Sequence, residues 1–167
     1  MQPILQNGVE GLIQEQDPAT AQEAIAGNIK LIEGVVGSYP DDVELLNMAA
    51  MARANYAFVF MVDRLEALRL AHPENTLEAT RLKRRIQLSY AAGRTHAEQA
   101  LSQNSNWQEA VGDDLESLSP EAFNTALTTL EEDAAEAAFW LAFCWGGTMQ
   151  VELDPASATQ LPKVERL

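Results

Sequence analysis

Few side chains in this sequence are arranged for catalysis or for metal binding. His72 precedes a proline, and His96 has no histidine or cysteine at the spacing that a metal site on a helix requires. The sequence contains no His-Glu-x-x-His motif, no glycine-rich phosphate loop and no Gly-x-Ser-x-Gly motif. The paired carboxylates Asp113 and Asp114 stand where a loop or the start of a helix is expected, which favours acids for structural reasons. We therefore expect no catalytic residue, no metal site and no cofactor.

Arg53 is a charged side chain within an apolar segment that runs from Leu45 to Val62. Placing a charge in such a helix is costly unless the charge finds a partner. Three alternatives follow from the sequence. Arg53 pairs with a core carboxylate, or it holds the anionic group of a ligand, or its face of the helix is exposed.

A second apolar segment, Ala137–Met149, contains two of the three tryptophans, the only cysteine and no charge. A helix that is apolar on every side is typical of a core position, so we expect a buried central helix. The segment is too short to span a bilayer, which takes ~20 apolar residues. Gly146 and Gly147 would allow another backbone, or a ligand, to approach this helix closely. Cys144, in its middle, is expected to be an inert, packed thiol.

These two segments supply the candidate ligand-binding residues. One face of the second helix carries, at helical spacing, Trp140, Phe143, Cys144 and Gly147. Tyr56 and Phe60 of the first helix are expected to oppose them. Ordinary core packing is the alternative for each of them. With Arg53 placed to meet a carboxylate head group, the predicted set for an apolar ligand is Arg53, Tyr56, Phe60, Trp140, Phe143 and Gly147.

The charge of the chain is large and unevenly distributed. The formal net charge of −14 argues against nucleic acid and against anionic membrane surfaces as partners. A basic cluster contains Arg81, Lys83, Arg84 and Arg85, whereas the span between Thr95 and Pro162 has twelve acids and no lysine or arginine. This acidic span is either a solvated surface or a face that steers a basic partner. In the second case, docking should weaken as the ionic strength rises.

The 167 residues are enough for a single helical domain with a sizeable core, and β-branched residues are sparse. Asp17 and Pro18 predict the start of a helix that ends near Gly37. Asp41 with Glu44, and Asn75 with Glu78, stand in the spacing of a capping box, which predicts two further helix starts.

The remaining helices are predicted with less regular signals. We expect a short helix over Pro3–Gln14, and a long one from Thr76 to about Ser102 with Leu77 facing inward and the basic cluster facing out. Trp107 is predicted to lie in a short connection. A further helix should begin at Ser119 and run to Leu130. These elements predict an all-α fold.

The break at Tyr39-Pro40 followed by an alanine-rich helix resembles the junction between tetratricopeptide repeats, although the spacing is not a clean period of about 34 residues. Taken in order, several segments are similar to the T component of tripartite ATP-independent periplasmic (TRAP) transporters. These segments are Ser38–Leu46, Ala54–Phe60, Tyr90–Leu101, Ala137–Gly147, Asp154–Ala156 and Leu161–Leu167.

The resemblance implies a tetratricopeptide-like stack of antiparallel helix hairpins on the periplasmic side of the membrane. Members of the family are typically lipoproteins that associate with the transporter's substrate-binding protein. They can assemble as trimers with apolar cavities, and their proposed role is to handle a hydrophobic ligand. Compared with the family, we expect residues 1–167 to be without the leader, the lipid-bearing cysteine and the further C-terminal helices. We therefore expect lipid anchoring only in a full-length precursor, and residues 1–167 to be a fragment or a shortened member.

Two other functions fit the sequence. One is a tetratricopeptide-like scaffold that binds a peptide in its concave groove without a small ligand. The other is a cytoplasmic helical bundle with a regulatory role. The apolar, alanine-rich inner helices favour the transport accessory over the scaffold, because peptide grooves usually present polar and basic side chains.

Overall fold

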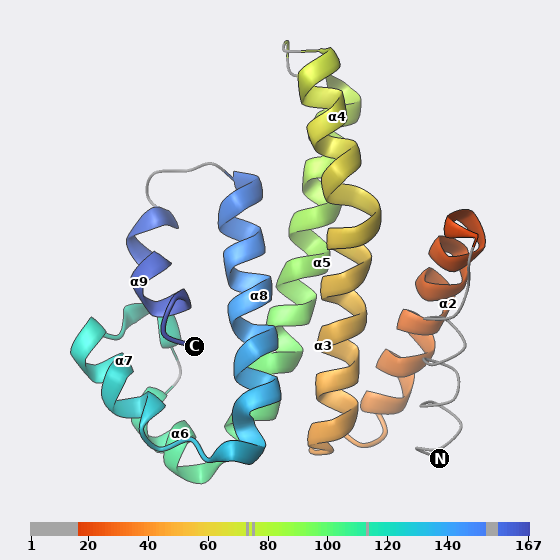
Figure 1. Ribbon diagram of the computed structural model, residues 1–167. Coiled ribbons are helices and arrows are strands. Elements are labelled where there is room, and N and C mark those ends of the chain that lie inside the picture. Colours follow the sequence, from red (N-terminus) through yellow and green to blue (C-terminus); the bar gives the residue numbers. More distant parts are fainter. Residues whose placement is uncertain (1–16, 73, 75, 113, 153–156) are drawn as a thin grey trace.

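The computed structural model describes residues 17–72, 74, 76–112, 114–152 and 157–167. Every regular element among these residues is helical, which confirms the all-α prediction (Figure 1). The helix predicted over Pro3–Gln14 lies outside the described residues. The elements, in chain order, are α2 (Pro18–Val36), α3 (Val43–Ala57), the π-helical turn η1 (Phe58–Val62), α4 (Asp63–Ala71), α5 (Leu77–Ser102), α6 (Ser105–Val111), the 3-10 turn η2 (Leu115–Ser117), α7 (Pro120–Leu127), the 3-10 turn η3 (Glu132–Ala134), α8 (Ala135–Glu152), the 3-10 turn η4 (Ser157–Gln160) and α9 (Leu161–Val164).

The longer helices α2, α3, α5 and α8 run alternately up and down beside one another (Figure 1). α2 packs on α3, α3 packs on α5, and α5 packs on α8, while α3 also reaches α8. α3, η1 and α4 form one continuous helix, and α5 returns along it, so that α4 and the first turns of α5 project beyond α2 and α8 (Figure 1). The shorter helices α6, α7 and α9 lie on the far side of α8 from α3 (Figure 1). Antiparallel pairing is therefore present, whereas tetratricopeptide-like stacking stays a prediction.

The helix starts confirm one predicted cap and correct two. The Asp17 carboxylate accepts from the amides of Ala19 and Thr20, as predicted for an N-cap. For α3 the cap is Asp42, one residue after the predicted Asp41, and it accepts from the Leu45 amide at 3.1 Å.

For α5 the cap is Thr76 instead of Asn75, and its hydroxyl accepts from the Ala79 amide at 3.2 Å. Glu44 and Glu78 thus lie one position closer to the helix start than a capping box requires. There they still favour the helix, because its positive end attracts acids.

Three other predictions are corrected. Trp107 is 3% exposed and lies within α6, which Asn104 caps through the Trp107 amide, so it belongs to a helix and to the core. α7 ends at Leu127 and not at Leu130, because the chain tightens into a turn after Ala126. Leu77 is 65% exposed instead of facing inward, because it is the first residue of a helix whose start projects from the body.

The core has two parts, one on either side of the middle of α8. One gathers Leu46, Leu101, Trp107, Phe123, Leu141 and Trp145, where α3, α5 and α8 meet the shorter helices. The other gathers Ala54, Met61, Leu65, Ile86, Tyr90 and Cys144 between α3, α5 and α8. The continuous helix Val43–Ala71 is, by length and composition alone, apolar enough to cross a membrane, but half of its most apolar window is buried by its neighbours.

Arg94 and Lys163 are the cations at the two ends of the acidic span, and both hold the C-terminal helices in place. Arg94 of α5 lies 4.3 Å from the centre of the Trp145 ring, and its Nη1 donates to the Glu116 carboxylate at 2.6 Å. Lys163 of α9 is buried, and its Nζ donates to the backbone oxygens of Leu115 and Glu116. The turn around Glu116 is thus bound from both α5 and α9.

Candidate functional site

α8 is central in the fold, but it is not enclosed on every side as its apolar sequence predicts. Ala137, Leu141 and Cys144 are buried against α3 and α5, whereas Phe139 is 53% exposed. The reason is geometric. Neighbouring helices cover part of the circumference of α8, so some of its apolar side chains must face outward.

The exposed edge of α8 and the π-helical turn η1 together form a cluster of rings. We call Phe58, Phe139, Trp140 and Phe143 the aromatic face. The Phe143 ring lies at its centre, with ring centroids 5.5 Å from Phe58, 5.9 Å from Phe139 and 5.9 Å from Trp140. Edge-to-face and tilted contacts of this kind favour a defined arrangement of the rings. Trp140 is held further by its Nε1, which donates to the Glu136 carboxylate at 3.4 Å.

Phe58 reaches this cluster from the first position of the π-helical turn η1. A π turn inserts an extra residue into the helical ladder and changes the direction in which the following side chains point. Phe58 and Val59, at its start, are both about half exposed, whereas Met61 and Val62 return to the core. The sequence does not predict this turn, and Phe58 is not among the predicted ligand-binding residues.

The structure brings some of the predicted site residues together and separates others. Trp140 and Phe143 share the aromatic face. Tyr56 and Phe60 contact each other, with ring centroids 6.0 Å apart, while the ring that meets Phe143 from the opposite helix belongs to Phe58. Phe58 and Phe139 are thus the members that sequence reasoning missed. The sequence does give a signal for Phe139. Because α8 is apolar on every side, any side that its neighbours leave uncovered must expose an apolar residue.

Beneath the aromatic face, α5 and α8 approach closely through two glycines. A Cβ at Gly147 would lie 2.6 Å from the Tyr90 ring, and a Cβ at Gly93 would lie 2.7 Å from the Cys144 sulfur. The space beside Gly147 is therefore filled by Tyr90, whose ring also contacts Phe143 at 6.4 Å between centroids.

Burial raises the pKa of both reactive groups in this layer. Desolvation raises the pKa of Tyr90 to about 12, with the nearby Cys144 adding to it, and raises the pKa of Cys144 to about 12 against a smaller opposing effect of Arg94. Both groups are consequently neutral near pH 7, and Cys144 is fully buried, as predicted for a packed thiol. The layer under the aromatic face presents apolar contact and no charge.

Arg53 is paired with a carboxylate, the first of the three alternatives. Its Nε donates to Glu33 Oε1 of α2 at 2.6 Å, its Nη2 pairs with the same oxygen, and Lys30 binds Glu33 Oε2 at 2.8 Å. Burial tends to raise the pKa of Glu33, but the hydrogen bonds from Lys30 and Arg53 outweigh it, so the pKa lies below its usual value. His96 Nε2 lies 3.8 Å from the same carboxylate. Arg53 is thus held by Glu33 of α2, whose single negative charge it shares with Lys30.

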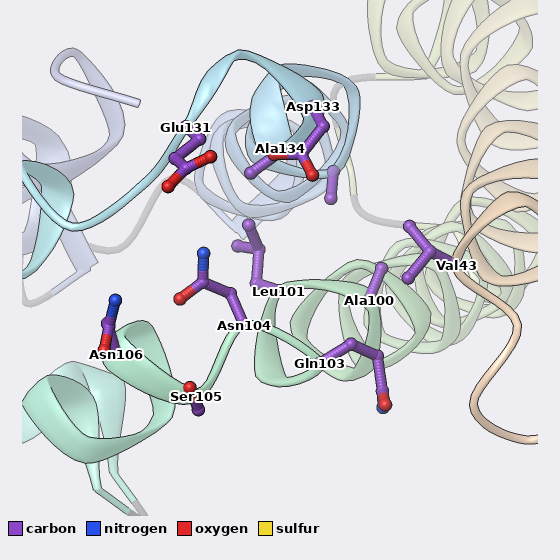
Figure 2. Close-up of a pocket in the computed structure, with 11 residues that line it drawn as sticks. Val43, Ala100, Leu101, Gln103, Asn104, Ser105, Asn106, Glu131, Asp133 and Ala134 are labelled. Carbon is purple, nitrogen blue, oxygen red and sulfur yellow. The ribbon is translucent and has the colours of Figure 1, made fainter.

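A cleft of about 340 Å³ opens at the N-terminal end of α8, where α5 passes into α6. Figure 2 shows Glu131 and Asp133 on one side of it and Asn104 and Ser105 on the other. Its floor is apolar and includes Leu101 and Ala137. We call it the acidic cleft. Its chemistry suits a cationic or hydroxyl-bearing group with an apolar stem.

Comparison with known protein families gives one match. The family model described as "TRAP transporter T-component" matches residues 14–167. No curated protein and no solved structure matches the chain.

Proposed function

This chain belongs to the TRAP transporter T-component family, and on that premise we propose that it docks the transporter's substrate-binding protein and holds a hydrophobic ligand without catalysing a reaction. As a member of that family it is a component of a TRAP transporter. The family consists of transporter accessories that are generally not enzymes, and it implies a location on the periplasmic side. Lipid anchoring of the full-length precursor and assembly as a trimer are part of the same proposal.

The observation that carries the ligand proposal is the aromatic face. Phe58 of η1 and Phe139 of α8 are each about half exposed around Phe143, whereas Leu141 and Trp145 of α8 are buried. Leaving such rings in water forgoes the free energy of burial, which is about 1.5–3 kcal/mol for a phenylalanine side chain. Adjacent exposed rings therefore favour a surface that is covered in use, by an apolar ligand or by a partner.

The acidic cleft supports the docking proposal. Glu131 and Asp133 line it, and they belong to the span from Thr95 to Pro162 that has twelve acids and no lysine or arginine. A basic side chain on the substrate-binding protein would be attracted by this field and would find carboxylates and amide oxygens inside the cleft.

One observation favours the alternative, a protein-binding scaffold without a small ligand. The rim of the acidic cleft carries polar side chains such as Glu131 and Asn104, and neither Trp140 nor Phe143 lines it. The aromatic face is open on one side because Phe139 is 53% exposed, and an open apolar face suits a protein partner as well as a lipid.

Native mass spectrometry of the purified full chain separates the two functions. We expect retained mass of lipid or fatty-acid size, lost in Phe139→Ala and kept in Leu31→Ala. Leu31 is a suitable control because it is also an exposed large apolar side chain, at 57%, but lies on α2. Bare protein that nevertheless binds the substrate-binding protein, with binding weakened by Phe139→Ala alone, would contradict the ligand proposal and support the scaffold.

A further inference from the structure

The hairpin of α4 and α5 projects from the body (Figure 1). It carries a groove of its own. The groove has a volume of about 500 Å³ and lies between Arg64 of α4 and the first turns of α5. Its other lining residues are Leu77, Glu78, Arg81, Leu82 and Arg85. Three arginines and one glutamate give it a local net charge of +2 in a chain whose net charge is −14.

The basic side chains of this hairpin have two separate roles. Arg69 Nη2 donates to the Val151 oxygen at 3.1 Å, and Lys83 Nζ donates to the Glu152 oxygen at 3.3 Å. Both therefore satisfy carbonyls at the C-terminal end of α8, where a helix favours cations. Lys83 thus turns toward α8, against the prediction that the whole basic cluster faces out.

The arginines of the groove are not used in this way. Arg64 pairs with Glu78 at 2.6 Å across the groove. Arg81 and Arg85, in contrast, form no ion pair with any carboxylate of the described residues. They stand four residues apart on α5, so they lie on one face of the helix, where like charges repel.

Two guanidinium groups beside an apolar floor have a definite ligand preference. Guanidinium groups recognise carboxylate and phosphate with paired, parallel hydrogen bonds. An oxyanion between Arg81 and Arg85 would also remove their mutual repulsion. Leu82, which also lines the groove, is buried. Leu77 is 65% exposed and gives the groove an apolar edge. A small inorganic anion would leave this edge in water, whereas a ligand with an apolar chain would cover it.

We propose that this groove binds a small amphiphile with an oxyanion head, the head lying between Arg81 and Arg85 and the apolar chain lying on Leu77 and Leu82. Glu78 disfavours a highly charged head, but its charge is already taken by Arg64. The groove is separate from the aromatic face and from the acidic cleft, with which it shares no residue. The inference therefore does not rest on the proposed function.

The test is a titration of the full chain with octanoate and with octyl phosphate, followed through the arginine Nε–Hε signals by NMR. We expect saturable shifts of the Arg81 and Arg85 signals. Arg81→Gln and Arg85→Gln should each weaken binding about three- to tenfold, the range for one partly exposed charge-assisted contact. Arg84→Gln is the matched control, because Arg84 is exposed on the same helix and does not line the groove. The tighter of the two ligands identifies the head group.

Two results would overturn the proposal. If Arg84→Gln weakened ligand binding as much as Arg81→Gln and Arg85→Gln do, the effect would come from the overall charge and not from a defined site. Equal binding of 1-octanol would show that the oxyanion makes no contribution. Both variants replace exposed side chains, and the circular dichroism of each variant shows whether it has kept the fold.

Discussion

The ring of Tyr90 occupies the space in which a side chain at position 147 would lie. Three of its carbons would be within 2.9 Å of a Cβ on Gly147, and the ring is itself almost completely buried. The contact lets α5 and α8 approach closely and supports the aromatic face from below through Phe143. The neighbouring Gly146 differs, because its Cβ would meet only Val164, at 3.4 Å.

Alanine at position 147 should therefore lower the free energy of unfolding, whereas alanine at position 146 should raise it. Gly147→Ala forces the Tyr90 ring to move, and we expect a loss of about 1–3 kcal/mol in the free energy of unfolding. Gly146→Ala gains up to about 1 kcal/mol of helix propensity without a clash. Urea unfolding of both variants measures the difference. Equal effects of the two substitutions would contradict the packing described for Tyr90.

The pairing of Arg53 with Glu33 predicts a dependence of stability on pH. Because the pKa of Glu33 is lowered in the folded state, its contribution is present above its ordinary value of 4.5 and is lost as the pH falls through the folded value. Glu33→Gln should cost roughly 1–2 kcal/mol at pH 7, between the values for exposed and for buried ion pairs. The difference from the unmodified protein should shrink below pH 4.5.

Urea unfolding at a series of pH values measures this effect. Glu23→Gln, an exposed acid on the same helix, is the control and should show no such loss. If the cost of Glu33→Gln were the same at pH 7 and at pH 3, Glu33 would not act through its charge.

Much of the architecture could be predicted from local signals. Asp17 followed by Pro18, and Ser119 followed by Pro120, fix helix starts because the cap and the proline act within one turn of chain. The long helix ending at Ser102 was predicted from the polar residues at its start and from its apolar positions. The caps at Asp42 and Thr76 were missed by one residue, since two neighbouring polar residues can each cap and only the packing of the helix chooses between them.

The candidate site depended on tertiary structure and was predicted only in part. The apolar sequence of α8 indicates that the helix is central, but not which side stays uncovered, so Phe139 was missed. Arg53 was recognised as needing a partner, yet its partner Glu33 lies on another helix, 20 residues earlier. Phe58 lies at the first position of a π-helical turn, which no sequence motif predicts.

Burial of Tyr90 and Cys144 predicts that stability falls at alkaline pH. Their pKa values rise from 10.0 and 9.0 to about 12 in the folded state, so between about pH 9 and 12 the unfolded chain loses protons that the folded chain keeps. The unfolded state is therefore favoured progressively as the pH rises.

The slope of unfolding free energy against pH should flatten in this range for Tyr90→Phe and for Cys144→Ala. Tyr39→Phe, which alters a half-exposed ring, should keep the slope.

The same burial of Cys144 predicts that a thiol reagent labels this residue only after the protein unfolds. Rapid labelling of the folded protein at pH 8 would show that the thiol is accessible.

The acidic cleft makes docking of the substrate-binding protein a test of electrostatics. Removing both charges with Glu131→Gln and Asp133→Asn should slow association several-fold at low salt, because the attraction acts mainly on the rate of encounter. The effect should fade at high salt, where the Debye length drops to about 3 Å at 1 M. Surface plasmon resonance at two ionic strengths measures both rates.

Glu23→Gln with Glu109→Gln is the matched control, since it changes the net charge equally at exposed positions outside the cleft. If the control pair slowed association as much as the cleft pair, the whole acidic surface would steer the partner and the cleft would have no special part. If neither pair changed the rate, and binding were also insensitive to salt, docking would have to use an apolar surface. The aromatic face would then be the surface to mutate, because Phe139 combines high exposure with contacts to two of its other rings.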